Sequence, residues 1–153
     1  MTFSFTIADP RMSGCPLIGC STGFGTLCGY TMDDIVGRNC RFLVDPVPRD
    51  KVDWKMRRHA KDFCEAVRVG KQFRIPDKER EEWMPIGRAG DELFCYQVNA
   101  RKDGSLFNNM FYMKAWFTYE KSKSQQSWQR SCDGIRDPFM VSFFDRRPVL
   151  SMS

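Results

Sequence analysis

The sequence has 153 residues, of which 42% are hydrophobic, and its 24 basic and 19 acidic residues give a net charge of +5. This length suffices for one buried core, and the dispersed positive charge does not demand a nucleic-acid partner. The sequence has seven cysteines without a CxxC pair and a single histidine, which disfavours both a disulfide framework and a zinc site. The start lacks a signal-peptide pattern and no apolar run reaches about 18 residues, which predicts a soluble protein of the cytoplasm or nucleus, without a membrane contact.

The N-terminal part predicts a hairpin followed by two short helices. Residues 3–8 are a strand candidate that ends at Asp9-Pro10, and residues 16–20 are the candidate for the returning strand. Ser21 can cap the first helix and Thr31 the second, whose first turn is acidic as the helix dipole favours.

The middle part predicts one long amphipathic helix, from residue 50 to a stop at Gly70. Its apolar residues recur at steps of three and four, at Val52, Met56, Ala60, Phe63 and Val67. Residues 71–91 are charged, contain Pro76 and Pro85, and follow neither a helical nor a strand period. We therefore expect an inserted surface loop at 71–91.

The C-terminal part predicts three strands. Residues 93–101 and 106–118 are aromatic-rich runs on either side of an Asp-Gly turn, and residues 138–144 supply the last strand after a long polar loop. The order of elements predicts an α+β fold, an antiparallel sheet with its helices on one face. We expect a single domain over residues 1–147, followed by a short tail at 148–153.

Cys40 lies in the segment GRNCRFL between groups that bind polar ligands. A lone cysteine usually packs as a small hydrophobic residue. Here, however, Asn39 offers both a donor and an acceptor, and Arg38 and Arg41 offer forked donors that suit phosphate. This grouping favours a phosphorylated ligand.

A second polar set straddles the predicted turn at Asp103-Gly104. Asn99 precedes the turn and Asn109 follows it, so that a hairpin would bring them nearly opposite each other. Two carboxamides on one wall can match the donors and acceptors of a planar heterocycle. Each asparagine taken alone is equally compatible with a solvent-facing strand position.

The segment PLIGCSTGFGTLCGYTMDDIVGRNCRFL resembles the light-oxygen-voltage (LOV) family of blue-light photoreceptors, a flavin-binding branch of the PAS fold. Six of the seven fixed letters of the family motif GxNCRFLQ stand at 37 and 39–43. The likeness extends to FTIADP, NARKDGSLFNNMF and FMVSFFD. It implies a PAS-like five-stranded antiparallel sheet with helices on one face, in a short-type domain with an insertion after the long helix.

The resemblance implies a pocket for flavin mononucleotide (FMN) and a cysteine that adds reversibly to ring carbon C4a under blue light. The matching positions are the thiol at Cys40, the ribityl contact at Asn39, the phosphate contact at Arg41, and the contacts to the pyrimidine edge at Asn99 and Asn109. A second phosphate contact in the long helix stays open between Arg57, Arg58 and Lys61, most of which would otherwise lie on a solvated helix face.

The sequence departs from the family pattern at two positions. Val44 replaces the glutamine that ends the motif, which removes a hydrogen bond that contributes about 0.5–1.5 kcal/mol. Phe143 stands where the last strand of the family carries a glutamine that contacts flavin N5 and O4. Because phenylalanine has no donor or acceptor, we expect thiol addition to persist with a blue-shifted absorption band, altered dark recovery and altered signalling.

The favoured function is therefore blue-light sensing without enzymatic turnover, with FMN as the cofactor. The effector is unknown, and one option for the output is a homodimer that forms through the sheet face. The main alternative is a PAS module that binds flavin or another small ligand without photochemistry, which Val44 and Phe143 favour. A flavoenzyme that uses Cys40 as a redox thiol is disfavoured, because no paired cysteine motif or GxGxxG segment occurs. A nucleic-acid-binding module is the weakest alternative, because basic and aromatic residues do not interleave.

Overall fold

The computed structural model describes the backbone of residues 4–79, 92–119 and 135–145, and the side chains of these residues except 77, 116–119 and 135–145. Five antiparallel strands form one sheet in the order β2-β1-β5-β4-β3. The strands are β1 (Ser4–Ala8), β2 (Leu17–Cys20), β3 (Glu92–Ala100), β4 (Leu106–Tyr119) and β5 (Ile135–Asp145). The predicted five-stranded antiparallel α+β architecture is confirmed.

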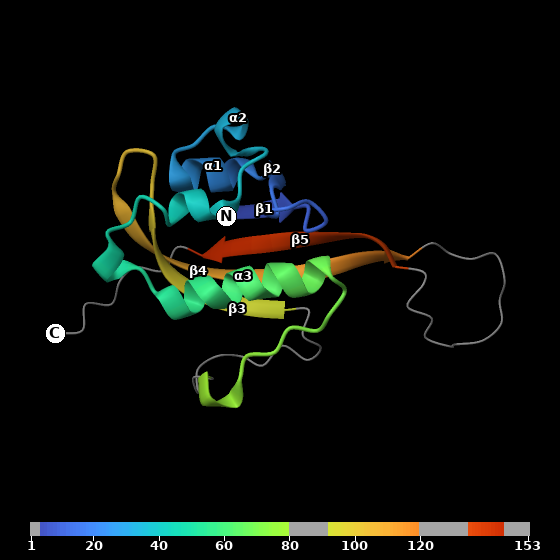
Figure 1. Ribbon diagram of the computed structural model, residues 1–153. Helices are drawn as coiled ribbons and strands as arrows, with labels where there is room; N and C mark the ends of the chain where they lie inside the picture. The colour runs from blue at the N-terminus through green and yellow to red at the C-terminus, as the bar shows by residue number, and fades with distance from the viewer. Residues whose placement is uncertain (1–3, 80–91, 120–134, 146–153) are drawn as a thin grey trace, which may run out of the picture.

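The helices gather over this sheet, as Figure 1 shows. They are α1 (Thr22–Cys28), α2 (Met32–Ile35) and α3 (Trp54–Arg68), with short 3₁₀ helices η1 (Cys40–Leu43), η2 (Arg49–Lys51) and η3 (Asp77–Glu79). Helix α1 packs beside β1, α2 beside β2 and α3 beside β3. Within the described ranges, no helix has both the length and the apolar character needed to cross a bilayer.

Local capping fixes the two short helices where the sequence predicts them. The Ser21 hydroxyl accepts hydrogen bonds from the backbone N–H of Phe24 at 3.2 Å and of Phe5 at 3.0 Å, so the cap of α1 also joins this helix to β1. Thr31 and Asp34 form a capping box at the start of α2. Both predicted caps are confirmed.

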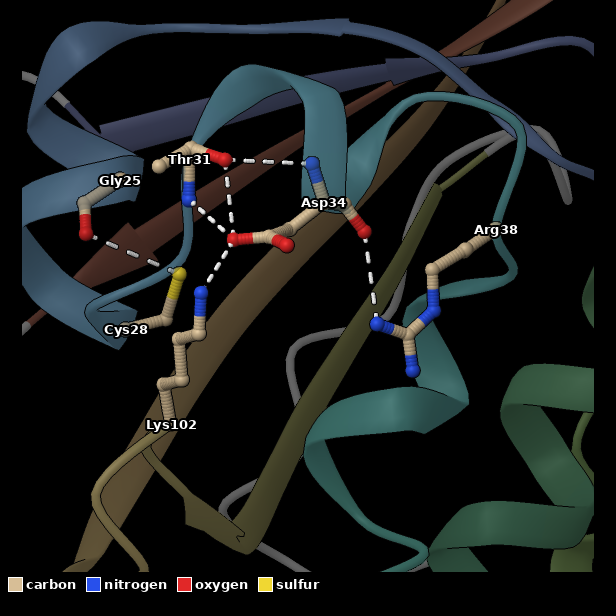
Figure 2. A network of polar contacts seen from close by, with 6 residues as sticks. All are labelled: Gly25, Cys28, Thr31, Asp34, Arg38 and Lys102. Atoms are coloured by element: carbon tan, nitrogen blue, oxygen red, sulfur yellow. Dashed lines mark hydrogen bonds and ion pairs between the residues drawn. The ribbon is translucent and has the colours of Figure 1, made fainter.

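The carboxylate of Asp34 also connects α2 to the turn between β3 and β4. In Figure 2 it accepts hydrogen bonds from Thr31 and from Lys102 Nζ, which lies 2.7 Å away. The Lys102 ammonium, followed by the bonds from Thr31, holds the pKa of Asp34 well below its usual range. This contact fixes the hairpin against the N-terminal helices.

Helix α3 begins at Trp54, later than the residue 50 predicted from periodicity. The side chain of Asp53 accepts a hydrogen bond from the Met56 N–H at 2.9 Å and caps the helix there, while residues 49–51 form the separate helix η2. The helix then buries one face, which consists of Met56, His59, Phe63 and Val67. Gly70, at φ +68°, follows its last turn in the left-handed conformation that glycine tolerates.

Residues 71–79 pack back onto α3. The ring of Phe73 meets Phe63 edge to face, with 5.7 Å between the ring centroids. Glu79 accepts a hydrogen bond from Arg58 at 2.7 Å, and its carboxylate lies 3.0 Å from His59 Nε2. This first part of the predicted insertion is therefore anchored on the long helix, whereas residues 80–91 lie outside the described residues.

The β3–β4 hairpin has a different register from the predicted one. Asn109 pairs with Gln97, and Asn99 pairs with Phe107, so that the two asparagines lie diagonally across the strands. The predicted polar loop over residues 120–137 lies mostly outside the described residues, and β5 extends beyond the predicted range of 138–144.

Candidate functional site

A cavity of about 1030 Å³ is lined by residues of the sheet, η1, α3 and the β1–β2 turn. Its size suits a cofactor or another small organic ligand. The apolar part of its lining includes Leu43, Phe111 and Met113, and its polar part includes three carboxamides from β3 and β4. The cavity thus combines an apolar interior with a few polar groups that can orient a bound molecule.

The three carboxamides are Gln97, Asn99 and Asn109, and their residues are 3%, 3% and 0% exposed. Gln97 Oε1, Asn99 Oδ1 and both polar atoms of the Asn109 side chain have no hydrogen-bond partner among the described residues. An unsatisfied buried polar group costs about 1–3 kcal/mol, so this wall is unfavourable unless a ligand supplies partners. A planar ring with alternating donors and acceptors fits this donor set.

Gln97 is the residue of this wall that the sequence analysis missed. Side chains alternate between the two faces of a strand, so Gln97 and Asn99 point to the same side of β3. The register then brings Gln97 directly opposite Asn109. The period of two around Asn99 was the signal that could have identified it.

The segment GRNCRFL places Asn39 and Cys40 at the cavity through the turn of η1. Asn39 caps η1: its Oδ1 accepts a hydrogen bond from the Arg41 N–H at 2.9 Å, and its Nδ2 donates to the Gly14 carbonyl. Asn39, Cys40 and Arg41 all line the cavity. These local bonds fix the loop that carries the Cys40 thiol.

The Cys40 side chain keeps partial exposure because it faces the cavity, yet protein atoms surround it on its other sides. Burial raises the pKa of the thiol to about 12, and the neighbouring Thr6 hydroxyl opposes that shift. At neutral pH Cys40 is therefore a neutral thiol. Any reaction at this sulfur needs an electrophile that is itself activated.

Arg38, which the sequence analysis grouped with Cys40 as a phosphate donor, does not line the cavity. Its Nη1 donates to the Asp34 carbonyl at 3.3 Å, as Figure 2 shows, and its guanidinium lies 4.6 Å from the centroid of the Phe42 ring. The expectation for Arg38 was wrong, because neighbours along an irregular segment point in different directions. Val44 is buried and does line the cavity.

Five basic residues line the cavity, and they differ in their partners. Three of them form ion pairs: Arg57 with Asp45 at 2.7 Å, Arg58 with Glu79 at 2.7 Å, and Arg68 with Glu65. The side chains of the other two, Arg41 and Lys61, form no hydrogen bond or ion pair with any described residue. Arg41 and Lys61 are therefore the cations most available to an anionic ligand.

Cys15 lines the cavity, whereas Cys20 does not, and the Cys20 thiol instead lies 3.5 Å from Met32 Sδ. Position 143 lies in β5, where the backbone of Phe143 pairs with Phe5 on β1 and with Tyr112 on β4. The side chain of Phe143 is outside the described part of the structure, and its contact with a ligand stays a prediction.

Comparison with known sequences finds relatives among blue-light receptors, although no family model matches the chain. Phototropin-2 of Oryza sativa subsp. japonica is 39% identical over 64 residues, which are 40% of this chain and 7% of that protein. Protein TWIN LOV 1 of Arabidopsis thaliana is 30% identical over 123 residues, which are 78% of this chain and 23% of that protein. The chain thus spans less than a quarter of the length of either relative.

Comparison with solved structures finds the same fold. The light-state structure of the LOV domain of the blue-light photoreceptor Aureochrome1 has a TM-score of 0.62 at 23% identity, covering 97% of this chain and 84% of that one. The light-state dimer of the fungal blue-light photoreceptor Vivid has a TM-score of 0.62 at 18% identity, covering 94% of this chain and 77% of that one. The sheet order and the cavity described above are thus set in a fold shared with these proteins.

Proposed function

The chain belongs to the light-oxygen-voltage (LOV) family of PAS domains, and from this membership we propose that it senses blue light through bound FMN. The observation that carries this proposal is the wall of buried, unsatisfied carboxamides in the same cavity as Cys40. An isoalloxazine ring offers carbonyl, imide and ring-nitrogen groups along one edge. Asn99, Asn109 and Gln97 would hold that edge.

Arg41 and Lys61 would hold the phosphate. Both line the cavity, and neither side chain forms an ion pair with a described residue, unlike those of Arg57 and Arg58. Arginine binds phosphate as a fork, whereas lysine binds it as a compact charge. Asn39, which also lines the cavity, would contact the ribityl chain with whatever donor capacity its bond to Gly14 leaves.

Cys40 would supply the reactive sulfur. When bound, the flavin supplies blue-light absorption and, in its excited state, an electrophilic carbon C4a to which the thiol adds reversibly. The η1 turn holds Cys40 in the cavity wall, and the raised pKa keeps its proton on sulfur in the dark. The apolar residues Leu43 and Met113 would keep competing water away.

Two positions would tune this response. Val44 cannot donate the hydrogen bond that a glutamine would give, so FMN binds somewhat more weakly without being excluded. The contact of Phe143 with flavin N5, with its blue-shifted band and altered dark recovery, stays a prediction that the register does not favour, because position 143 pairs with Tyr112, whereas Phe111 and Met113 on either side of Tyr112 line the cavity.

The decisive experiment compares the visible absorption spectrum of the purified, FMN-loaded chain before and after blue light, for the native sequence and for Cys40→Ala. We expect a flavin band in both proteins, and a bleaching that reverses in the dark only in the native protein. An unchanged native spectrum after illumination would sink the photochemical proposal. A yellow, unresponsive protein would instead support the alternative function, a PAS module that binds flavin or another small ligand passively.

We further propose that the domain works as a sensor and leaves catalysis to partners. Some relatives are named blue-light-activated histidine kinases, as in Erythrobacter litoralis, and the chain matches only a small part of each. A homodimer through the sheet face is one output compatible with this fold, and light-state dimers of Vivid are a precedent. Light scattering of the chain in the dark and under blue light tests this output, and a monomer under both conditions refutes it.

A further inference from the structure

The cavity wall contains one more carboxamide than the pyrimidine edge of a flavin needs. Gln97 and Asn99 on β3 and Asn109 on β4 all line the cavity, and each of these residues is at most 3% exposed. The pyrimidine edge presents two carbonyl acceptors with one imide donor between them. Two carboxamides satisfy these three groups, because each carboxamide offers an NH₂ donor and an oxygen acceptor. The third amide of the wall therefore needs another partner.

The three carboxamides do not satisfy one another. Gln97 lies directly opposite Asn109 in the register of β3 and β4, and Asn99 lies two residues further along β3. Even so, Gln97 Oε1, Asn99 Oδ1 and both polar atoms of the Asn109 side chain have no hydrogen-bond partner among the described residues. A buried amide without a partner is unfavourable. A ligand accounts for the Gln97 side chain, whereas contacts within the described part of the protein do not.

The other candidates for an additional flavin contact are less suitable. Asn39 is the fourth carboxamide among the described residues that line the cavity, but its oxygen and its nitrogen both have partners in the protein backbone. Position 143 on β5 is level with Tyr112 on β4, and Tyr112 is not among the residues that line the cavity. Gln97 is therefore the amide that remains available for a further group on the ring.

We propose that Gln97 binds flavin N5 and that its amide changes from donor to acceptor when this nitrogen gains a proton, an inference that rests on the FMN site proposed above. The ring nitrogens N1 and N5 flank the pyrimidine edge, and both are acceptors in oxidised flavin. N1 lies beside the ribityl chain at N10, which leaves N5 open to a side chain of the wall. In the dark, the NH₂ group of Gln97 donates to N5.

Thiol addition converts N5 from an acceptor into a donor. The Cys40 sulfur bonds to C4a, the double bond between C4a and N5 becomes single, and the thiol proton ends on N5. The Gln97 oxygen must then accept, and a rotation of the amide group exchanges its nitrogen and oxygen. Because β3 is an edge strand of the sheet, the response to light would begin at that edge.

The test measures dissociation constants in the dark, by calorimetric titration of the ligand-free full chain with FMN and with 5-deazaFMN, in which a C–H group replaces N5. We expect the native protein to bind FMN more tightly than 5-deazaFMN. We expect Gln97→Leu to lose about three- to tenfold in affinity for FMN and less than about twofold for 5-deazaFMN. Gln97→Met, which keeps the length of the side chain, should behave in the same way.

Asn109→Leu is the matched control, because Asn109 lies directly across from Gln97 and serves the pyrimidine edge, which both ligands share. It should weaken both ligands by a common factor. Equal losses for the two ligands in Gln97→Leu and Gln97→Met overturn the proposal. A native protein that binds both ligands equally also overturns it, and this result does not depend on whether any variant folds.

These dark affinities do not involve the Cys40 thiol, so the proposal can fail while reversible bleaching still establishes the photochemistry. A native protein that binds neither ligand would refute the FMN site itself and this inference with it. A second measurement is the light-minus-dark infrared difference spectrum of the FMN-loaded chain. We expect a carboxamide C=O band that shifts on illumination in the native protein and is lost in Gln97→Met. Persistence of every such band in that variant would overturn the exchange at Gln97.

Discussion

Replacing Lys61 by glutamine tests which cation binds the phosphate of the ligand. Lys61 lines the cavity and forms no ion pair with a described residue, although Glu65 on the next turn attracts it, whereas Arg57, one turn earlier on α3, pairs with Asp45 at 2.7 Å. Lys61→Gln removes one charge and little volume. Arg57→Gln is the matched control, because it removes the same charge from the same helix at a site where that charge is already balanced.

The expected magnitude follows from the exposure of Lys61. A lysine and a phosphate about 4 Å apart attract each other by about 1 kcal/mol in water and by about 4 kcal/mol at the effective dielectric constant of a protein surface. Because Lys61 is exposed at the cavity rim, the value should lie near the lower limit, at about 1–1.5 kcal/mol. This free energy corresponds to a Kd for FMN that is roughly five- to tenfold higher.

The assay is a fluorescence titration of ligand-free protein with FMN and, in parallel, with riboflavin, which lacks the phosphate. We expect Lys61→Gln to weaken FMN binding about five- to tenfold and to change riboflavin binding by less than about twofold. We expect Arg57→Gln to change both affinities little, and added salt to reduce the Lys61 effect. If Lys61→Gln lowers the affinities for FMN and riboflavin equally, or if Arg57→Gln lowers the affinity for FMN more, the inference that Lys61 and not Arg57 binds the phosphate is refuted.

Three further substitutions test the site and its supports. Asn109→Leu removes unsatisfied buried polar atoms, so it should raise the free energy of unfolding of the ligand-free chain, measured in urea, by about 1–3 kcal/mol. The same substitution should weaken flavin binding. A lower free energy of unfolding would contradict this account. Lys102 lowers the pKa of Asp34 below the ordinary aspartate value of 3.8, and the stability gained from this shift is lost as the pH falls below 3.8. Lys102→Met should therefore flatten the dependence of the free energy of unfolding on pH in that range. An unchanged slope would contradict this prediction. Ser21→Ala should lower the free energy of unfolding by about 1 kcal/mol in urea, because α1 loses its cap, and an unchanged midpoint would contradict it.

Local signals placed most elements of the fold. The side chains of Ser21 and Thr31 cap helices where their sequence context predicts caps, and the turn at 101–105 joins the two long strands. The order of the strands was beyond local patterns. Strand β5 inserts between β1 and β4, and β1 is far from it in sequence, so periodicity carries no information on that pairing.

The details of the site depended on features that composition does not display. In the hairpin turn, the Ser105 N–H donates to Asp103 at 2.9 Å, and the turn spans five residues, which sets Asn109 opposite Gln97. A tight two-residue turn would have produced another register. The start of α3 moved for a similar reason, because the side chain of Asp53 captures the first free N–H groups.

The docking of residues 71–79 on α3 sets a limit for anyone who shortens this domain for use as a compact fusion tag. A splice from Gly70 directly to Glu92 would delete Phe73, uncover the edge of Phe63 that it contacts, and leave Arg58 without its acidic neighbour. Such a splice would shorten the chain but expose apolar surface on α3. The safe cut therefore begins after residue 79.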